Sequence, residues 1–142
     1  LGKRVRMNNG TEWVYLKASA SIPQYAVVVS VDGTTTQGTT STLGLRGMSH
    51  AINQQAALVT GDYAWFLLAN PLGNTTYKVR VAASCGIDIK LATTAFAGTL
   101  DDTTAGTVLR IDGIVLTDSQ PAGSSGSRTF RTSSYPLGWG GV

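Results

Sequence analysis

The strongest local structural signal in the sequence is Val5-Arg6-Met7-Asn8-Asn9-Gly10-Thr11-Glu12-Trp13-Val14-Tyr15-Leu16. At its centre lies Asn9-Gly10, a dipeptide favoured in the two-residue type I′ turn that joins antiparallel strands. The flanking segments are rich in β-branched and aromatic residues, which suit a pleated and half-buried surface. The sequence therefore predicts a β-hairpin close to the amino end.

Further short apolar segments, each bounded by Gly, Pro, Asn or Asp, predict more strands. Val27 to Val31 lies between Pro23 and Asp32-Gly33. Both alternating sets of side chains are apolar from Tyr63 to Ala69, so we expect that strand to be covered on both faces. Alternation predicts half-exposed strands over 77–83, 87–91 and 108–116. In the last of these, Leu109, Ile111 and Val115 should share one face, and Gly113 should mark a bulge or a tight bend.

Two segments fit this pattern less well. Residues 34–42 carry no apolar side chain, which predicts an exposed loop or a polar edge. Residues 51–59 contain enough Ala, Gln and Leu for one short helix.

The sum predicts an all-β protein, a single-domain β-sandwich or small β-barrel-like fold of about eight short strands with extended terminal segments. Residues 1–8 form a basic amino-terminal arm that leads into the first hairpin, and residues 9–117 form the β-domain. Residues 118–142 form a Ser/Gly-rich carboxy-terminal segment and an aromatic tail, with no element of its own.

Composition limits the classes of function. The 142 residues suffice for one ordinary domain, with 42% hydrophobic and 13% charged residues. A net charge of +3 is mild for a nucleic-acid-binding protein, so nucleic acid is not the expected partner. The longest apolar run, Ala64 to Ala69, is far too short to cross a bilayer, and no membrane role is predicted.

Few residues could carry catalysis or bind a metal. His50 is the only histidine, and the sequence contains no Gly-x-Ser-x-Gly motif whose serine it could activate as a general base. We expect it to face solvent or an interface. Cys85 is the only cysteine and should be buried and inert, and two Cys/His residues cannot form a zinc site. Asp101-Asp102 reads as a turn. We therefore expect no catalytic residues, no metal and no cofactor, and a protein that is not an enzyme.

Several segments together resemble a known group of proteins. Their succession of strands and turns is similar to that of small structural proteins of tailed-bacteriophage virions, the capsid decoration or cement proteins; the segments are Asn9–Ser19, Ile22–Val27, Gly61–Phe66, Val81–Cys85 and Thr93–Asp102. The resemblance implies an all-β homotrimer that binds the major capsid protein on the outside of the phage head and stabilises its lattice. It also implies localisation on the exterior of the virion, after assembly in the host cytoplasm.

This hypothesis assigns roles to two groups of residues. Contacts to the capsid or between subunits are expected from Lys3, Arg4, Arg6, Tyr135 and Trp139. Packing in the core or along a trimer axis is expected from Tyr63, Trp65 and Phe66.

Two alternatives stay open. One is another virion β-module, such as a head-fibre base, a tail or neck protein, or a carbohydrate-binding module that uses Trp13 or Trp139 as an aromatic platform; the other is a nucleic-acid-binding β-barrel.

Overall fold

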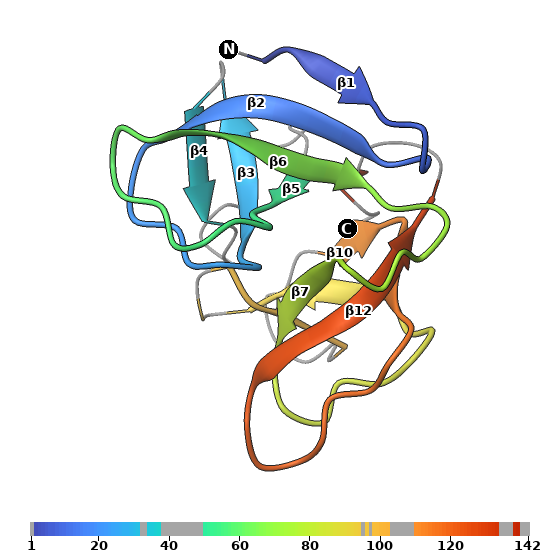
Figure 1. The fold of residues 1–142 in the computed structure, drawn as a ribbon. Helices are drawn as coiled ribbons and strands as arrows, with labels where there is room; N and C mark the ends of the chain where they lie inside the picture. Colours follow the sequence, from blue (N-terminus) through green and yellow to red (C-terminus); the bar gives the residue numbers. More distant parts are fainter. Residues whose placement is uncertain are drawn as a thin grey trace.

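A computed structural model describes residues 2–31, 34–37, 50–94, 96, 98–102, 110–133 and 138–139 (Figure 1). Within these ranges the chain forms strands and no helix, which confirms the expected all-β class. The described part holds thirteen strands rather than about eight, because several elements are only two or three residues long. The strands form one sheet of six and one of seven.

The first sheet curls into a ring. Its strands lie in the order β1 (Arg4–Arg6), β2 (Glu12–Ala18), β4 (Thr34–Gln37), β3 (Val27–Val31), β5 (His50–Ile52) and β6 (Tyr63–Ala69). Strand β2 also pairs with β6, so the five strands from β2 to β6 close on themselves. Strand β1 lies outside this ring, along the first half of β2.

The predicted first hairpin is confirmed, but the predicted turn type is wrong. Gly10 has a φ of 81°, whereas Asn9 is not among the described residues with positive φ. The N–H of Gly10 donates to the carbonyl of Met7 at 3.0 Å, and the N–H of Met7 donates to the carbonyl of Thr11 at 2.8 Å. This is a three-residue loop that ends in a left-handed glycine. The Asn9 side chain holds it, because its Oδ1 accepts from the Thr11 N–H at 3.1 Å and the Thr11 hydroxyl at 2.6 Å.

Two further expectations for the first sheet are wrong. Residues 34–37 form β4, which lies between β2 and β3 and is therefore neither a loop nor an edge; residues 38–42 lie outside the described part. Threonine is β-branched and favours strands, and backbone hydrogen bonds to the two neighbouring strands hold this segment in the sheet without apolar side chains. Residues 51–59 form no helix, since β5 ends at Ile52 and a loop follows. Buried Asn53 organises that loop by donating to the carbonyl of Pro23 at 3.2 Å and accepting from the N–H of Gln55 at 3.0 Å.

The carboxy-terminal segment was expected to contain no strand, but this prediction is wrong, because part of the segment belongs to the second sheet. Its order is β11 (Ile114–Leu116), β12 (Gly126–Thr132), β7 (Lys78–Val81), β9 (Leu100–Asp101), β8 (Leu91–Thr93), β10 (Arg110–Asp112) and β13 (Gly138–Trp139). The seven-residue β12 pairs with both β11 and β7. The β-fold therefore extends beyond residues 9–117 at both ends, through β1 and through β12.

Local turns change the strands expected over residues 87–91 and 108–116. No strand covers 87–90, because Asp88 has a φ of 56° and exposed Ile87 and Ile89 flank it; the strand begins at Leu91. Gly113, with a φ of 84°, forms the expected bend between β10 and β11. The bend shifts the alternation by one residue, so Ile114 and Leu116 are buried with Ile111 and Val115 is not; Leu109 lies outside the described residues.

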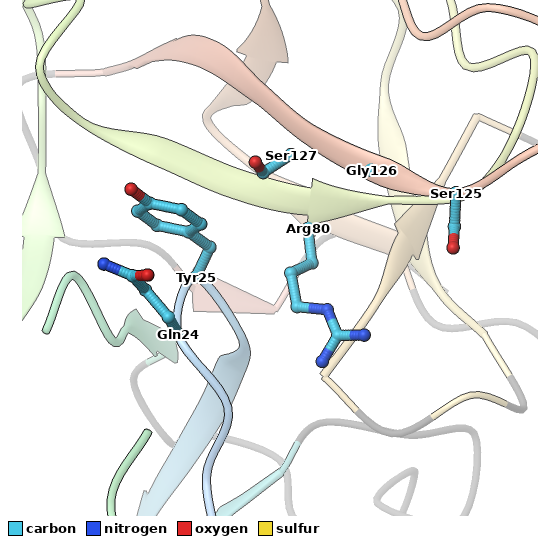
Figure 2. Close-up of a pocket in the computed structure, with 6 residues that line it drawn as sticks. All are labelled: Gln24, Tyr25, Arg80, Ser125, Gly126 and Ser127. Carbon is cyan, nitrogen blue, oxygen red and sulfur yellow. The ribbon is translucent and has the colours of Figure 1, made fainter. Parts of the chain in front are cut away.

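Hydrogen bonds join the ring to strand β7 of the second sheet. The Gln54 side chain acts like a neighbouring strand, because its Nε2 donates to the carbonyl of Lys78 at 2.7 Å and its Oε1 accepts from the Lys78 N–H at 3.1 Å. The Arg80 N–H donates to the carbonyl of Tyr25 at 2.9 Å, and Tyr25 lies against this strand (Figure 2). Strand β7 thus pairs with β12 along one edge, and its other edge contacts the loops of the ring at Lys78 and Arg80 and β9 at Val81.

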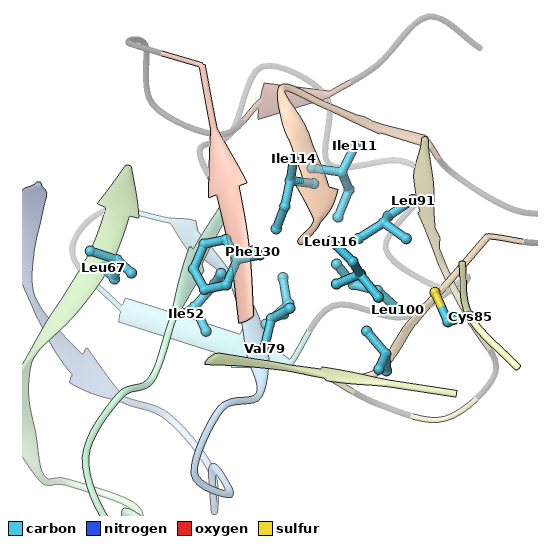
Figure 3. Close-up of a cluster of buried hydrophobic side chains, with 12 residues drawn as sticks. Ile52, Leu67, Val79, Cys85, Leu91, Leu100, Ile111, Ile114, Leu116 and Phe130 are labelled. Carbon is cyan, nitrogen blue, oxygen red and sulfur yellow. The ribbon is translucent and has the colours of Figure 1, made fainter. Parts of the chain in front are cut away.

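Two hydrophobic clusters form the interior. One fills the ring with side chains such as Val14, Leu16 and Phe66. The other lies between the sheets, where Ile52 and Leu67 of the ring meet Phe130, Ile111 and other side chains of the second sheet (Figure 3). The second sheet therefore covers part of the outer face of the ring and leaves the rest of that face open.

Candidate docking surface

The uncovered outer face of the ring lies over β1, β2 and β6. On β2, the side chains of Val14, Leu16 and Ala18 point into the ring, so Trp13, Tyr15 and Lys17 point outward. Residues directly opposite each other on paired strands share a face.

The register of β2 with its neighbours brings further side chains to this outer face. Tyr15 lies opposite Trp65, Lys17 opposite Tyr63, and Trp13 opposite Val5 of β1. Strands that are distant in sequence thus assemble one surface, which we call the aromatic strip and define as Val5, Met7, Trp13, Tyr15, Tyr63 and Trp65.

Ring contacts fix the geometry of the aromatic strip. The ring centroids of Tyr15 and Trp65 are 5.2 Å apart, and those of Tyr15 and Tyr63 are 6.1 Å apart. The Lys17 Nζ lies 5.7 Å from the Tyr63 centroid, in cation–π range. At the other end, Trp13 meets the edge of Tyr77 at 5.3 Å, where the second sheet begins. The rings thus support one another before any partner binds.

A groove of about 390 Å³ opens within the aromatic strip and is lined by Val5, Met7, Trp13 and Trp65. Met7 is 50% exposed and Tyr63 is 52% exposed, whereas the other four residues of the strip are half-buried. An apolar recess rimmed by aromatic side chains is the kind of surface that accepts an anchoring group from a partner.

Several basic residues lie near the aromatic strip. Lys17 lies on the same face, and none of the six residues of the strip is acidic. Lys3, Arg4 and Arg6, predicted as contact residues, are exposed beside it on and before the edge strand β1. Arg6 lies 3.6 Å from Glu12, so one of these cations already has a carboxylate partner.

The three residues predicted to pack in the core or along a trimer axis lie on two different faces of β6. Phe66 is completely buried inside the ring, whereas Tyr63 and Trp65 lie on the opposite face of β6, in the aromatic strip. Trp139 belongs to β13, whose backbone pairs with Ile111 at an edge of the second sheet, and Tyr135 lies outside the described residues. Among the described residues, the backbone of Trp139 therefore belongs to the second sheet, whereas the aromatic strip belongs to the first.

Sequence analysis missed most of the aromatic strip. Trp13 was considered only as a sugar platform, and Tyr15, Val5 and Met7 were not considered as contact residues. The alternating patterns Trp13-x-Tyr15-x-Lys17 and Tyr63-x-Trp65 were available as a signal. What the sequence lacks is the register that sets these patterns side by side.

The two residues with nucleophile or base chemistry are buried. His50, expected to face solvent or an interface, is 0% exposed on β5, and burial lowers its pKa to about 4, so its imidazole is neutral at pH 7. Cys85 is buried, and desolvation, together with Asp102 and Asp101, raises the pKa of its thiol to about 12. A protonated and buried thiol is a poor nucleophile.

Cys85, Asp101 and Asp102 form the one group of potential metal ligands among the described residues, with ligand atoms within 4.8 Å of one another. The Asp102 carboxylate accepts the N–H of Gly86 at 2.8 Å, and Asp101 Oδ1 accepts the N–H of Asp102 at 2.8 Å. Hard cations need more oxygen ligands than this group offers. The turn expected at Asp101-Asp102 is wrong for Asp101, which is the last residue of β9 and pairs with Ala92; the backbone hydrogen bonds account for the position of the two carboxylates.

Comparison with known proteins adds no functional information. Within the described residues, no helix has the length and apolar character needed to span a membrane. The chain matches no protein-family model, no curated protein and no solved structure.

Proposed function

We propose that this chain is a capsid decoration protein of a tailed bacteriophage, which binds the outer surface of the head and stabilises the lattice of major capsid subunits. The aromatic strip is the observation that carries the proposal. It is a partly exposed and mainly apolar surface on a folded sheet, and such surfaces mark sites of association. A ligand that binds the assembled lattice and not the dissociated subunits stabilises the lattice by mass action.

The composition of the aromatic strip favours a protein partner. Trp and Tyr dominate the energetics of protein interfaces when they fill well-packed pockets. The aliphatic side chains of Val5 and Met7 complete the groove beside Trp13 and Trp65. Lys17 and the cations near β1 would complement acidic groups at the rim of the partner's surface. In a homotrimer, three such surfaces combine through effective concentration, so each contact can be weak.

A carbohydrate-binding module is the second candidate, because the aromatic strip presents aromatic rings on the face of a sheet. The planes of Tyr15 and Tyr63 are inclined by only 23°, so this pair offers the most nearly parallel rings for stacking against sugars. The planes of Tyr15 and Trp65 are inclined by 48°, and those of Trp13 and Tyr77 by 75°. Together with the aliphatic groove, these inclinations favour an irregular protein surface over a flat sugar chain.

Co-sedimentation with expanded phage heads that lack the protein tests the proposal. The double variant Tyr63→Ser/Trp65→Ser should bind heads at least about 100-fold more weakly than the wild type, given two anchors of about 2 kcal/mol each. Phe96→Ser is the matched control, because Phe96 is 76% exposed and lies outside the aromatic strip. Circular dichroism checks that both variants fold.

Equal binding of heads by the wild type and the folded double variant would refute the docking surface. Absence of binding by the wild type, with saturable binding of a soluble glycan that the double variant loses, would favour the second candidate.

A further inference from the structure

A second recess lies apart from the aromatic strip, where a loop of the ring meets β7 and β12. It has a volume of about 280 Å³ and is lined by Gln24, Tyr25, Arg80, Ser125, Gly126 and Ser127 (Figure 2). Arg80 and Ser127 are directly opposite each other on β7 and β12 and therefore share a face. Val79 and Val81 point into the core, so this shared face is the outer one.

Arg80 is the only charged residue in the lining of this recess. Arg6, Arg128 and Arg131 each lie within 3.6 Å of a carboxylate oxygen. In the described part of the chain, no carboxylate lies within ion-pair distance of the half-buried Arg80 guanidinium. The recess thus holds a positive charge that no described carboxylate of the chain balances by an ion pair.

The recess is also a fixed structure. Tyr25 has a φ of 65°, a conformation that is rare for bulky residues and is retained where the surroundings impose it. Its N–H donates to the carbonyl of Asn53 at 2.6 Å, and its carbonyl accepts from the N–H of Arg80 at 2.9 Å. Gln24 Nε2 donates to the carbonyl of Gln54 at 3.2 Å. These bonds hold the loop in place against β7.

The lining of the recess also carries three hydroxyl groups, although that of Tyr25 points away from the Arg80 guanidinium (Figure 2). The hydroxyl groups of Tyr25, Ser125 and Ser127 make no hydrogen bond to any other described residue. A guanidinium offers paired N–H donors that match the two oxygens of a carboxylate.

We propose that this recess binds a carboxylate group. One positive charge balances one carboxylate, whereas phosphate sites typically add a helix N-terminus, a nest of backbone N–H groups or further cations. The carboxylate can belong to an Asp or Glu side chain of a partner protein or to an acidic sugar. The inference does not depend on the decoration function, because no residue is shared between this recess and the aromatic strip.

Titration of the intact protein, followed by NMR of the backbone amides, tests the proposal. The probes are N-acetylglutamate amide, glucuronate, acetate and inorganic phosphate at constant ionic strength. We expect saturable shifts centred on Gly126 and Ser127 with at least one carboxylate. Arg80→Gln should weaken this binding about tenfold or more, since a charge-assisted hydrogen bond is lost. Ser127→Ala should weaken it less, and the control Arg131→Gln should leave it unchanged.

The relative affinities of the probes identify the source of the carboxylate. Tighter binding of N-acetylglutamate amide indicates a protein side chain, and tighter binding of glucuronate indicates an acidic sugar. The proposal is overturned if no carboxylate gives saturable shifts, if phosphate binds more tightly than every carboxylate, or if folded Arg80→Gln and Ser127→Ala variants both bind like the wild type.

Discussion

Mild acid should destabilise the fold through a single side chain, His50. This residue is 0% exposed on β5, opposite Val29, and burial lowers its pKa from 6.5 to about 4. In the unfolded chain the imidazole regains an ordinary pKa of about 6.5. Between these two values the unfolded chain binds more protons than the folded one, so the free energy of unfolding falls as the pH falls.

The size of this loss follows from the shift in pKa. A shift of about 2.5 units corresponds to about 3 kcal/mol of stability, which is fully present above about pH 7 and is lost by about pH 4. At about pH 5.5 the loss already reaches about 1 kcal/mol. Urea unfolding across this range, for the wild type and for His50→Gln, isolates the effect because the carboxylates titrate in both proteins.

The difference in stability between the wild type and His50→Gln should shrink by about 1 kcal/mol between about pH 7.5 and about pH 5.5. Parallel pH profiles for the two proteins would refute the reasoning. A direct check is available because His50 is the only histidine, so the protein has one imidazole signal to follow by NMR. Titration of that signal near pH 6.5 in the folded protein would contradict a buried and neutral imidazole.

Three other perturbations have defined outcomes. Gln54→Ala should lower the free energy of unfolding in urea by about 1–3 kcal/mol, because it removes the partners of the Lys78 N–H and carbonyl; an unchanged stability would contradict this bridge. Gly113→Ala should cost more than Gly123→Ala: both glycines have positive φ, but a Cβ at Gly113 would lie 2.7 Å from the Ser133 hydroxyl, and one at Gly123 would meet nothing within 4 Å. Left-handed strain alone costs about 1–2 kcal/mol, so equal costs would show that the contact at Gly113 relaxes freely. Cys85 should react with a thiol reagent only as fast as the protein opens, and rapid labelling under native conditions would contradict its burial.

Local signals predicted much of the fold. The Asn9-Gly10 hairpin and the strands near 27–31, 63–69 and 78–81 follow from turn residues and alternation, and these are short-range properties of a chain. The bend at Gly113 was also predicted, from the glycine within an alternating segment. Its effect on alternation was not, because a single left-handed residue moves every later side chain to the other face.

Long-range pairing was the part that the sequence could not show. Polar β4 is held by ladder bonds to β2 and β3, and β12 gains its place by pairing with β7, about 50 residues earlier in the chain. The aromatic strip depends in the same way on the register of β2 with β6. Tyr63, Trp65 and Phe66 are adjacent in sequence, yet strand alternation sends Phe66 into the ring and the other two outward.

We propose that the outer face of β1, β2 and β6 docks the protein on a phage head. A cryo-electron microscopy map of the particle tests it most directly, because it shows both where the chain lies and which face it presents. We expect copies on the outer surface of the head, with Trp65 and Tyr63 against major capsid subunits. The claim is contradicted if the protein is absent from the head surface, or if it is present there with the aromatic strip facing solvent.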